Sequence, residues 1–301
     1  MQDEKDIHDD EIRIIGEAPT PQPSLPPRRK WALVAIAVVI LIAIVCWALR
    51  VRRDAELREE EPAYFEPQLD MLTQAQPQKP QWIGREVDSL AQGFCEIRDT
   101  TINDIALRIY IPHNAELSLH VGPMNKQDSM VVYASQAADI RADNGKIVGA
   151  FVLKGEPLAW GLSKKGFCAS INGEVTIGVT ENSPLFEQAT EMSGYFFRQY
   201  PLVSNGELVE NNPKNKSIRR SICDRQGEIF MVESLSEESF HDFAQSLVDL
   251  GVDNAIYLVG SSSYGWATRE DGSRHEFGSD DYYAGRRRMP KNTSYIVWRR
   301  K

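Results

Sequence analysis

A short apolar run that ends in glycine and three serines is the first place in this 301-residue chain where chemistry is expected. Residues 255–267 read AIYLVGSSSYGWA, so the run stops at Gly260 and continues as Ser261, Ser262 and Ser263. This pattern predicts a buried strand that opens into a loop of small residues, where a ligand can approach the backbone closely. Three alternatives follow: a serine nucleophile, a ligand-binding loop or a simple turn.

The spacing of the glycines disfavours a serine nucleophile. The nucleophile elbow of serine hydrolases needs G-x-S-x-G between a strand and a helix. Here four residues separate Gly260 from Gly265, one too many, and no helical pattern follows them. A ligand-binding loop or a turn is therefore the better interpretation of this stretch.

Metal-binding and redox motifs are not found. The histidines are scattered without an HExxH pattern, and His241 is expected on the surface of a helix. No two cysteines form a CxxC pair, so Cys95, Cys168 and Cys223 are predicted to be buried free thiols, with one disulfide as the alternative. The acidic pair 280–281 is interpreted as a solvated charge run. The sequence therefore identifies no cofactor, and no motif supports a divalent cation.

Arginines stand before two predicted strands. Arg219 and Arg220 precede the stretch 221–232, and the run 286–288 precedes the last strand. A guanidinium group at a strand end matches two phosphate oxygens, which suits a phosphate ligand. The alternative is that these arginines form surface salt bridges, and spacing alone favours that alternative.

The first 81 residues differ in composition from the rest. Residues 1–30 are acidic and proline-rich and are predicted to be disordered, whereas 31–49 contain no charge and match a single transmembrane helix about 30 Å long. Residues 50–81 read as a charged, Gln/Pro-rich tether, and 82–301 as one globular domain. Basic residues flank the apolar span almost equally, so the chemistry expected of the domain decides its placement outside an inner (cytoplasmic) membrane, on the periplasmic side.

The net charge of −9 argues against general affinity for nucleic acid, which needs a basic field. No motif in the acidic tail, residues 1–30, identifies a protein partner.

Period-two patterns dominate the first half of the domain and predict strands joined by Asn-Gly turns. These strands are expected at 105–112, 115–122, 129–135, 147–153, 166–171 and 174–179. One helix is expected between a Ser236 cap and Gly251, followed by a strand at 255–259 and a last strand at 294–298.

Several segments, in the same order, resemble the phosphodiester glycosidase family, which removes N-acetylglucosamine from a sugar-phosphate diester. They are GLSKKGFCASINGEVTIGV (161–179), MSGYFFRQYPLVSNGELV (192–209), RSICDRQGEIFMV (220–232), FHDFAQSLVDLGVDNAIYLVGSSS (240–263) and RMPKNTSYIVW (288–298). The resemblance covers about residues 130–301. It implies an α+β domain with mixed β-sheets and a few helices, preceded by the transmembrane helix, with a ligand cleft at strand ends.

The resemblance also implies site residues. It places the family's arginine at Arg220 and its terminal R-P-V-x-N motif on Arg288 and Asn292. These two arginines would hold the phosphate, and Gly260, Ser261, Ser262 and Ser263 would lie along the sugar. Ser193 and Gly194 would form the opposite wall.

The chain departs from the family where catalysis is expected. Val259 stands where the family carries aspartate, and a valine can neither orient a sugar hydroxyl nor transfer a proton. Asp139, Glu233 and Asp253 are the candidate replacement acids. Two functions follow: hydrolysis of a glycosyl-1-phosphodiester in an envelope glycan or glycolipid, or a catalytically inactive module that binds a sugar phosphate or acts as a scaffold.

Overall fold

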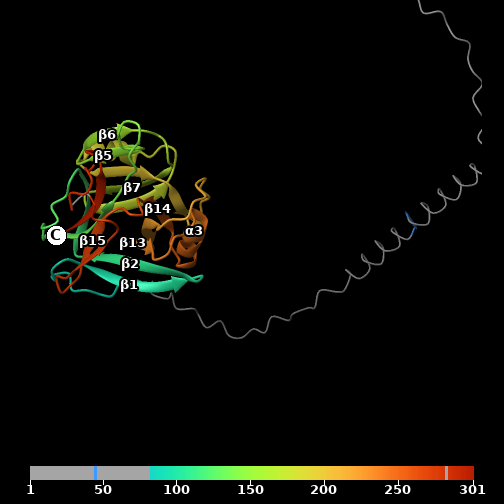
Figure 1. Ribbon diagram of the computed structural model, residues 1–301, viewed down its shortest axis with the longest axis horizontal. Coiled ribbons are helices and arrows are strands. Elements are labelled where there is room, and N and C mark those ends of the chain that lie inside the picture. Colours follow the sequence, from blue (N-terminus) through green and yellow to red (C-terminus); the bar gives the residue numbers. More distant parts are fainter. Residues whose placement is uncertain (1–43, 46–81, 282–283) are drawn as a thin grey trace, which may run out of the picture. The chain divides into compact units, whose positions relative to one another are not determined.

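Among the described strands, short turns join six consecutive pairs into β-hairpins. In the turn between β7 (Gly166–Ile171) and β8 (Glu174–Val179), Asn172 and Gly173 both adopt positive φ, as the tightest hairpin turns require. The computed structural model describes residues 44–45, 82–281 and 284–301, and those from Trp82 onward belong to one compact unit (Figure 1).

The strands form three sheets. The first has the order β1 (Phe94–Ile102), β2 (Ile105–His113), β13 (Glu228–Ser234), β12 (Arg220–Arg225), β14 (Asn254–Leu258), β10 (Pro201–Ser204) and β11 (Glu207–Leu208). The second has the order β16 (Arg274–Phe277), β15 (Gly265–Thr268), β4 (Val131–Gln136), β17 (Ser294–Arg300) and β3 (Ala115–Val121). The third has the order β6 (Glu156–Trp160), β5 (Ala150–Leu153), β9 (Tyr195–Gln199), β7 and β8.

The expectation of an α+β domain with mixed sheets is wrong. Every strand pair within the three sheets is antiparallel, and the domain from Trp82 onward has only two described helices, α2 (Leu185–Glu191) and α3 (Phe240–Asp249). Parallel pairing needs a crossover of a dozen or more residues, usually a helix, whereas short turns produce antiparallel pairs. The domain is therefore mostly β.

The predicted membrane span receives no support. No helix within the described residues is long and apolar enough to cross a bilayer. The predicted span 31–49 lies outside those residues apart from Ile44 and Val45, as do the predicted tail 1–30 and tether 50–81.

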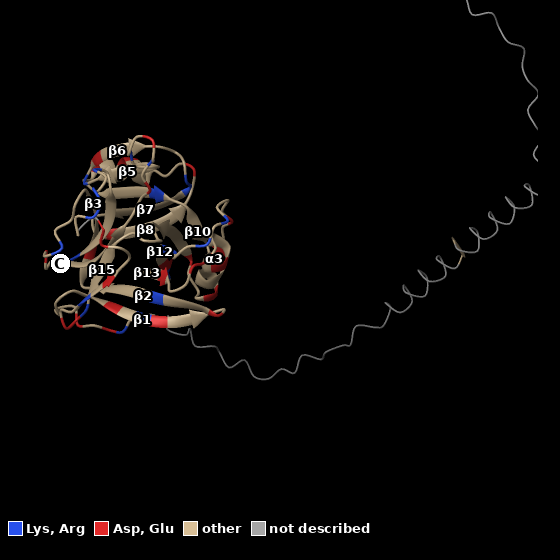
Figure 2. Ribbon diagram, in the orientation of Figure 1, with Lys and Arg blue, Asp and Glu red and all other residues tan. Residues whose placement is uncertain are grey.

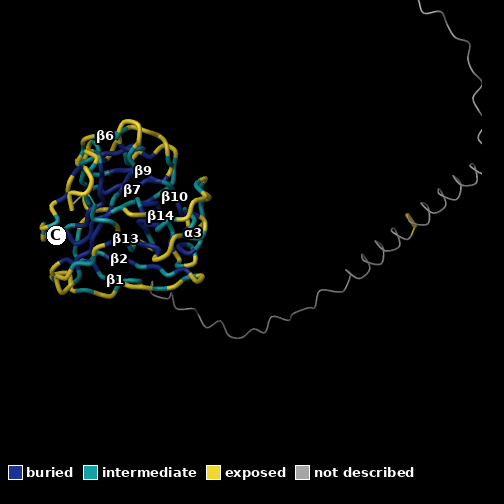
Figure 3. Tube along the Cα trace, viewed as in Figure 1, coloured by how far each residue is buried: buried dark blue, intermediate teal, exposed yellow. Residues whose placement is uncertain are grey.

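Apolar side chains from all three sheets meet in one central cluster, which includes Tyr110, Phe151, Phe197, Ile222 and Trp298. Figure 3 shows these buried strands inside the domain, with exposed loops around them. The charged residues lie mainly on loops and outer strands (Figure 2). The sheets thus share a core, and their strand ends are held in fixed positions relative to one another.

Helix α3 follows its predicted pattern but begins three residues later. Ser239, rather than Ser236, is the N-cap, and its side chain accepts a hydrogen bond from the backbone N–H of Asp242. Gly251 ends the helix with φ of +85°, a conformation that glycine adopts without strain. The buried face of the helix packs on the outer side of the first sheet.

Candidate functional site

The serine loop is a tight turn that packs against the chain before β12. A Cβ atom on Gly260 would lie 2.1 Å from the carbonyl oxygen of Ile218, so only glycine fits there. The N–H of Ser261 donates to the same carbonyl at 2.8 Å, and the N–H of Ser263 donates to the Gly260 carbonyl at 3.1 Å. Backbone hydrogen bonds within the loop and to Ile218 therefore fix its conformation.

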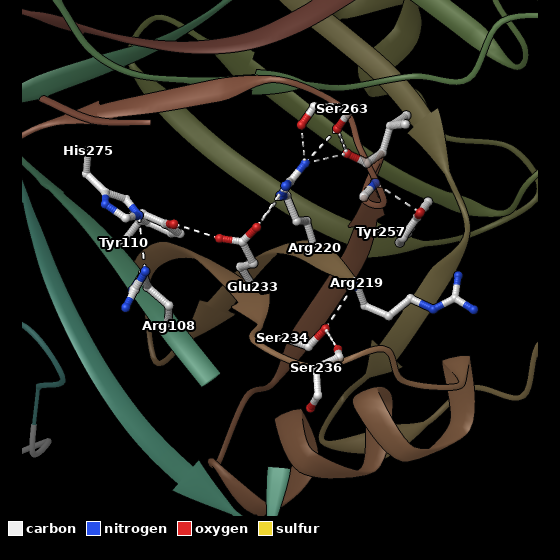
Figure 4. A network of polar contacts seen from close by, with 12 residues as sticks. Arg108, Tyr110, Arg219, Arg220, Glu233, Ser234, Ser236, Tyr257, Ser263 and His275 are labelled. Carbon is white, nitrogen blue, oxygen red and sulfur yellow. Dashed lines mark hydrogen bonds and ion pairs between the residues drawn. The ribbon is translucent and has the colours of Figure 1, made fainter. Parts of the chain in front are cut away.

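Arg220 supports this loop from the inside (Figure 4). Its Nε and Nη2 atoms donate to Glu233 Oε1 at 2.9 and 2.8 Å, while Nη1 donates to the carbonyl of Ser263 at 2.8 Å and to its hydroxyl at 2.6 Å. The guanidinium also lies 4.6 Å from the centre of the Phe277 ring. Arg220 is only 1% exposed. The arginine that the resemblance assigned to phosphate is thus buried and already paired.

Glu233, one of the three candidate acids, also has both carboxylate oxygens bound by protein partners. Its second oxygen accepts a hydrogen bond from the Tyr110 hydroxyl at 2.7 Å. Burial, together with the nearby charge of Glu233, raises the pKa of Tyr110, so this phenol stays neutral and donates. We call Arg220, Glu233, Tyr110 and Ser263 the closed network, because each polar group in it already has partners.

The edge of the closed network carries a second pair of polar residues (Figure 4). Arg108 donates to Asp99 and lies 3.2 Å from Nε2 of His275. Burial, and then the charge of Arg108, lowers the pKa of His275, so the ring is neutral and accepts from the arginine. These contacts connect Arg108 of β2 with Asp99 of β1 and His275 of β16.

Two of the predicted site elements lie away from the serine loop. Asp253 precedes β14, at the end of that strand opposite Val259, and accepts from the backbone N–H of Gln226. Ser193 and Gly194 form the turn after α2, where the N–H of Gly194 donates to Ala189 at 2.7 Å. Gly194 is needed because a Cβ atom there would lie 2.9 Å from the Ser170 carbonyl.

The remaining predicted residues lie on the surface. Ser261 and Ser262 are exposed at the tip of the loop, and Arg288 is exposed before β17. Asn292 donates to the carbonyl of Gly145 at 2.8 Å. Within the part of the chain that the structure describes, Arg288 makes no hydrogen bond or ion pair with Arg220 or with the serine loop.

Three strands, one from each sheet, end close to the serine loop. The N–H of Val259, directly after β14, donates to the carbonyl of Gln136 at the end of β4, at 3.1 Å. The side chain of Gln199, at the end of β9, donates to the carbonyl of Ala137 at 3.4 Å. We call this place the junction; it comprises Gln136–Asp139, Lys164, Gln199 and Val259–Ser262.

Lys164 joins the remaining parts of the junction. Its ammonium forms an ion pair with Asp139, donates to Gln199 Oε1 at 2.8 Å and lies 4.3 Å from the centre of the Tyr200 ring. The lysine side chain is 7% exposed, whereas that of Asp139 is 34% exposed. Asp139 is therefore a carboxylate fixed by a buried cation and still open to solvent.

The backbone and charge of Lys164 are both unusual. Its φ is +71°, a conformation that costs about 1–3 kcal/mol for a residue with a side chain. Burial lowers the pKa of its ammonium, an effect that Asp139 opposes. Strained backbone and shifted pKa values concentrate at functional sites.

Sequence reasoning found Asp139 but not Lys164 or Gln199. The only signal was the pair Lys164–Lys165 immediately before the buried strand β7. Successive side chains of an extended chain point to opposite faces, so one lysine of this pair can point inward while the other faces solvent. In the structure, Lys165 is exposed and Lys164 is not.

Metal and thiol chemistry gain no support. The described residues contain no group of three or more His, Cys, Asp or Glu that could hold a metal ion. As predicted, Cys95, Cys168 and Cys223 are free and buried. Burial raises the pKa of Cys223 to about 12, so this thiol is protonated near neutral pH.

Comparisons with known proteins concern the fold. No protein-family model and no curated protein matches the chain. Among solved structures, the chain is similar to the catalytic domain of zebrafish N-acetylglucosamine-1-phosphodiester α-N-acetylglucosaminidase, auto-inhibited by its pro-peptide. That match has a TM-score of 0.47 and 14% identity and covers 69% of this chain and 83% of the other. The chain is also similar to a hypothetical protein from Synechocystis, with a TM-score of 0.45, 12% identity and coverage of 69% and 62%. Neither match assigns chemistry to a residue.

Proposed function

We propose that the domain recognises a sugar or sugar phosphate at the junction and does not hydrolyse it. The observation that carries the proposal is the state of the acids near the serine loop. Glycoside hydrolysis uses two carboxyl groups on either side of the scissile bond. Of the three candidate replacement acids, Glu233 is buried and bound by Arg220 and Tyr110, Asp253 lies at the far end of β14, and Asp139 is partly exposed, while Val259 has no carboxylate.

The groups at the junction suit recognition of hydroxyls. A carboxylate fixed by one cation retains lone pairs that accept hydrogen bonds from a sugar. Asp139 supplies this acceptor, and the exposed hydroxyls of Ser261 and Ser262, which belong to the same junction, can donate or accept. Arg288 is exposed, so it, rather than Arg220, is the arginine proposed to contact a phosphate.

Calorimetric titration of the full chain tests this proposal. The ligands are N-acetylglucosamine 1-phosphate and N-acetylglucosamine. We expect the Asp139→Asn variant to bind both at least tenfold more weakly, because the fixed carboxylate is lost. The Arg288→Gln variant should weaken binding of the phosphorylated sugar alone.

A matched control is available on β14. Asp253→Asn changes a carboxylate at the far end of that strand and should leave the affinity unchanged. Equal binding by wild type and Asp139→Asn, or no saturable binding of either ligand, would contradict the proposal.

A further inference from the structure

A cavity on the third sheet, away from the closed network, has the size and the lining expected of a second binding site. Its volume is about 520 Å³, within the usual range of small-molecule sites. It lies between the end of β6 and the start of α2. The residues that line it include Ala150, Trp160, Leu162, Pro184, Phe186 and Arg198.

Apolar side chains form much of the cavity wall, and two of them are unusually exposed to solvent. Trp160 is 66% exposed and Leu162 is 69% exposed, whereas most large apolar side chains of the domain are buried. Phe186 closes the other side and packs edge-on against Phe196, with ring centres 5.6 Å apart. A ligand with an apolar body would remove this surface from water, which is favourable.

Arg198 supplies a buried positive charge at the cavity. It is 2% exposed, and its Nη atoms donate to backbone carbonyls of Lys164, Thr180 and Glu181 at 2.7–3.1 Å. No carboxylate of the described residues lies within ion-pairing distance of it, and its buried Nε proton has no acceptor among them. Buried charges are normally paired, and a buried donor without an acceptor calls for an explanation.

We propose that this cavity binds a small amphiphilic acid. The carboxylate or phosphate monoester of the ligand lies against Arg198 and compensates its charge. The apolar body lies between Trp160, Leu162 and Phe186. Glu187 is an exposed acid at the same cavity, so its charge weakens the binding of an anion.

Calorimetry with matched probes tests the proposal on the full chain. The probes are 4-phenylbutyrate, 4-phenylbutyl phosphate and the neutral alcohol 4-phenylbutanol, with inorganic phosphate as an arm that lacks the apolar body. We expect one or both amphiphilic anions to bind at least tenfold more tightly than the alcohol and than inorganic phosphate. The stronger of the two identifies the acid group.

Surface variants keep the test independent of folding. Trp160→Ala and Leu162→Asn should each lower the affinity for the anion about five- to tenfold. Glu187→Gln should raise that affinity two- to threefold. Leu158→Ala is the matched control, because Leu158 is exposed on the same strand but does not line the cavity. Equal affinity for the acid and the alcohol, or unchanged binding by Trp160→Ala, would overturn the proposal.

Discussion

Two buried arginines of this domain differ in what surrounds their charge. Arg220 is 1% exposed and Arg198 is 2% exposed. Arg220 is bound to the carboxylate of Glu233 and to Ser263. Among the residues that the structure describes, Arg198 donates only to backbone carbonyls, and its Nε proton has no acceptor. Two equally buried arginines therefore differ in whether a carboxylate of the described residues neutralises their charge.

The pairing of Arg220 with Glu233 and Ser263 changes the interpretation of the serine loop. An arginine beside glycine and serine residues suggested a phosphate site, but the acceptors that hold Arg220 are already part of the chain. The loop is a turn that Arg220 ties to the first sheet. The partly exposed carboxylate lies elsewhere in the junction, at Asp139, which the buried ammonium of Lys164 holds in place.

Removal of Arg220 should have the largest effect. Arg220→Met leaves Glu233 buried without its cation, and loss of one partner of a buried ion pair costs about 3–5 kcal/mol. Urea denaturation measures this loss in the free energy of unfolding. Arg288→Met, on the surface, should change it by less than about 0.5 kcal/mol. If both variants cost the same, the closed network does not stabilise the fold.

Gly260→Ala should be the next most harmful change. The new Cβ atom would overlap the Ile218 carbonyl, and such overpacking costs about 1–3 kcal/mol. The same denaturation experiment on Ser262→Ala, at the exposed tip of the loop, should show little change. A Gly260→Ala protein as stable as wild type would mean that the loop is not held against β12.

Arg198→Met should cost less than Arg220→Met. It gives up three hydrogen bonds to carbonyls but leaves no counter-charge stranded, so we expect about 1–3 kcal/mol. Thermal unfolding should also show that 4-phenylbutyrate stabilises the wild type and not this variant. If Arg198→Met lost more unfolding free energy than Arg220→Met, the expected difference between the two arginines would be contradicted.

A partly exposed network around Glu96 should show the smallest effect, and only in acid. Burial acts to raise the pKa of Glu96, but hydrogen bonds from His113, Arg85 and Arg98 outweigh it and hold the pKa below 4.5. Its stabilisation is complete above pH 4.5 and is lost as the pH falls through the lowered pKa.

The Glu96→Gln variant should therefore lose less stability than wild type as the pH falls below 4.5. Denaturation at a series of pH values measures this difference. Glu156→Gln, an exposed change on β6, serves as the control. If the stability of wild type and Glu96→Gln fell in parallel with pH, the lowered pKa of Glu96 would be contradicted.

The local elements could be predicted from the sequence because their signals are local. Apolar alternation and the Asn172–Gly173 turn correctly predicted β7 and β8, and the apolar face correctly predicted α3. The direction of strand pairing was wrong, since the expectation of mixed sheets came from a family resemblance and not from the short connections of the chain. The pattern of turns already favoured hairpins.

The site was harder to predict because its contacts are distant in sequence. Arg220 and Ser263 are 43 residues apart, and Lys164 and Gln199 are 35 apart. The family resemblance singled out Arg220 and the candidate acids Asp139 and Glu233. It could not show that Glu233 saturates Arg220 while Asp139 keeps an open side.

Turnover of a phosphodiester distinguishes recognition of a sugar phosphate from its hydrolysis. The full chain is incubated with a methyl phosphodiester of N-acetylglucosamine, and phosphorus NMR follows both binding and cleavage in one sample. We expect a perturbed but chemically unchanged phosphorus signal, in wild type and in Asp253→Asn alike. Cleavage by the wild type that disappears in Asp139→Asn would contradict it, because one open carboxylate would then suffice for hydrolysis.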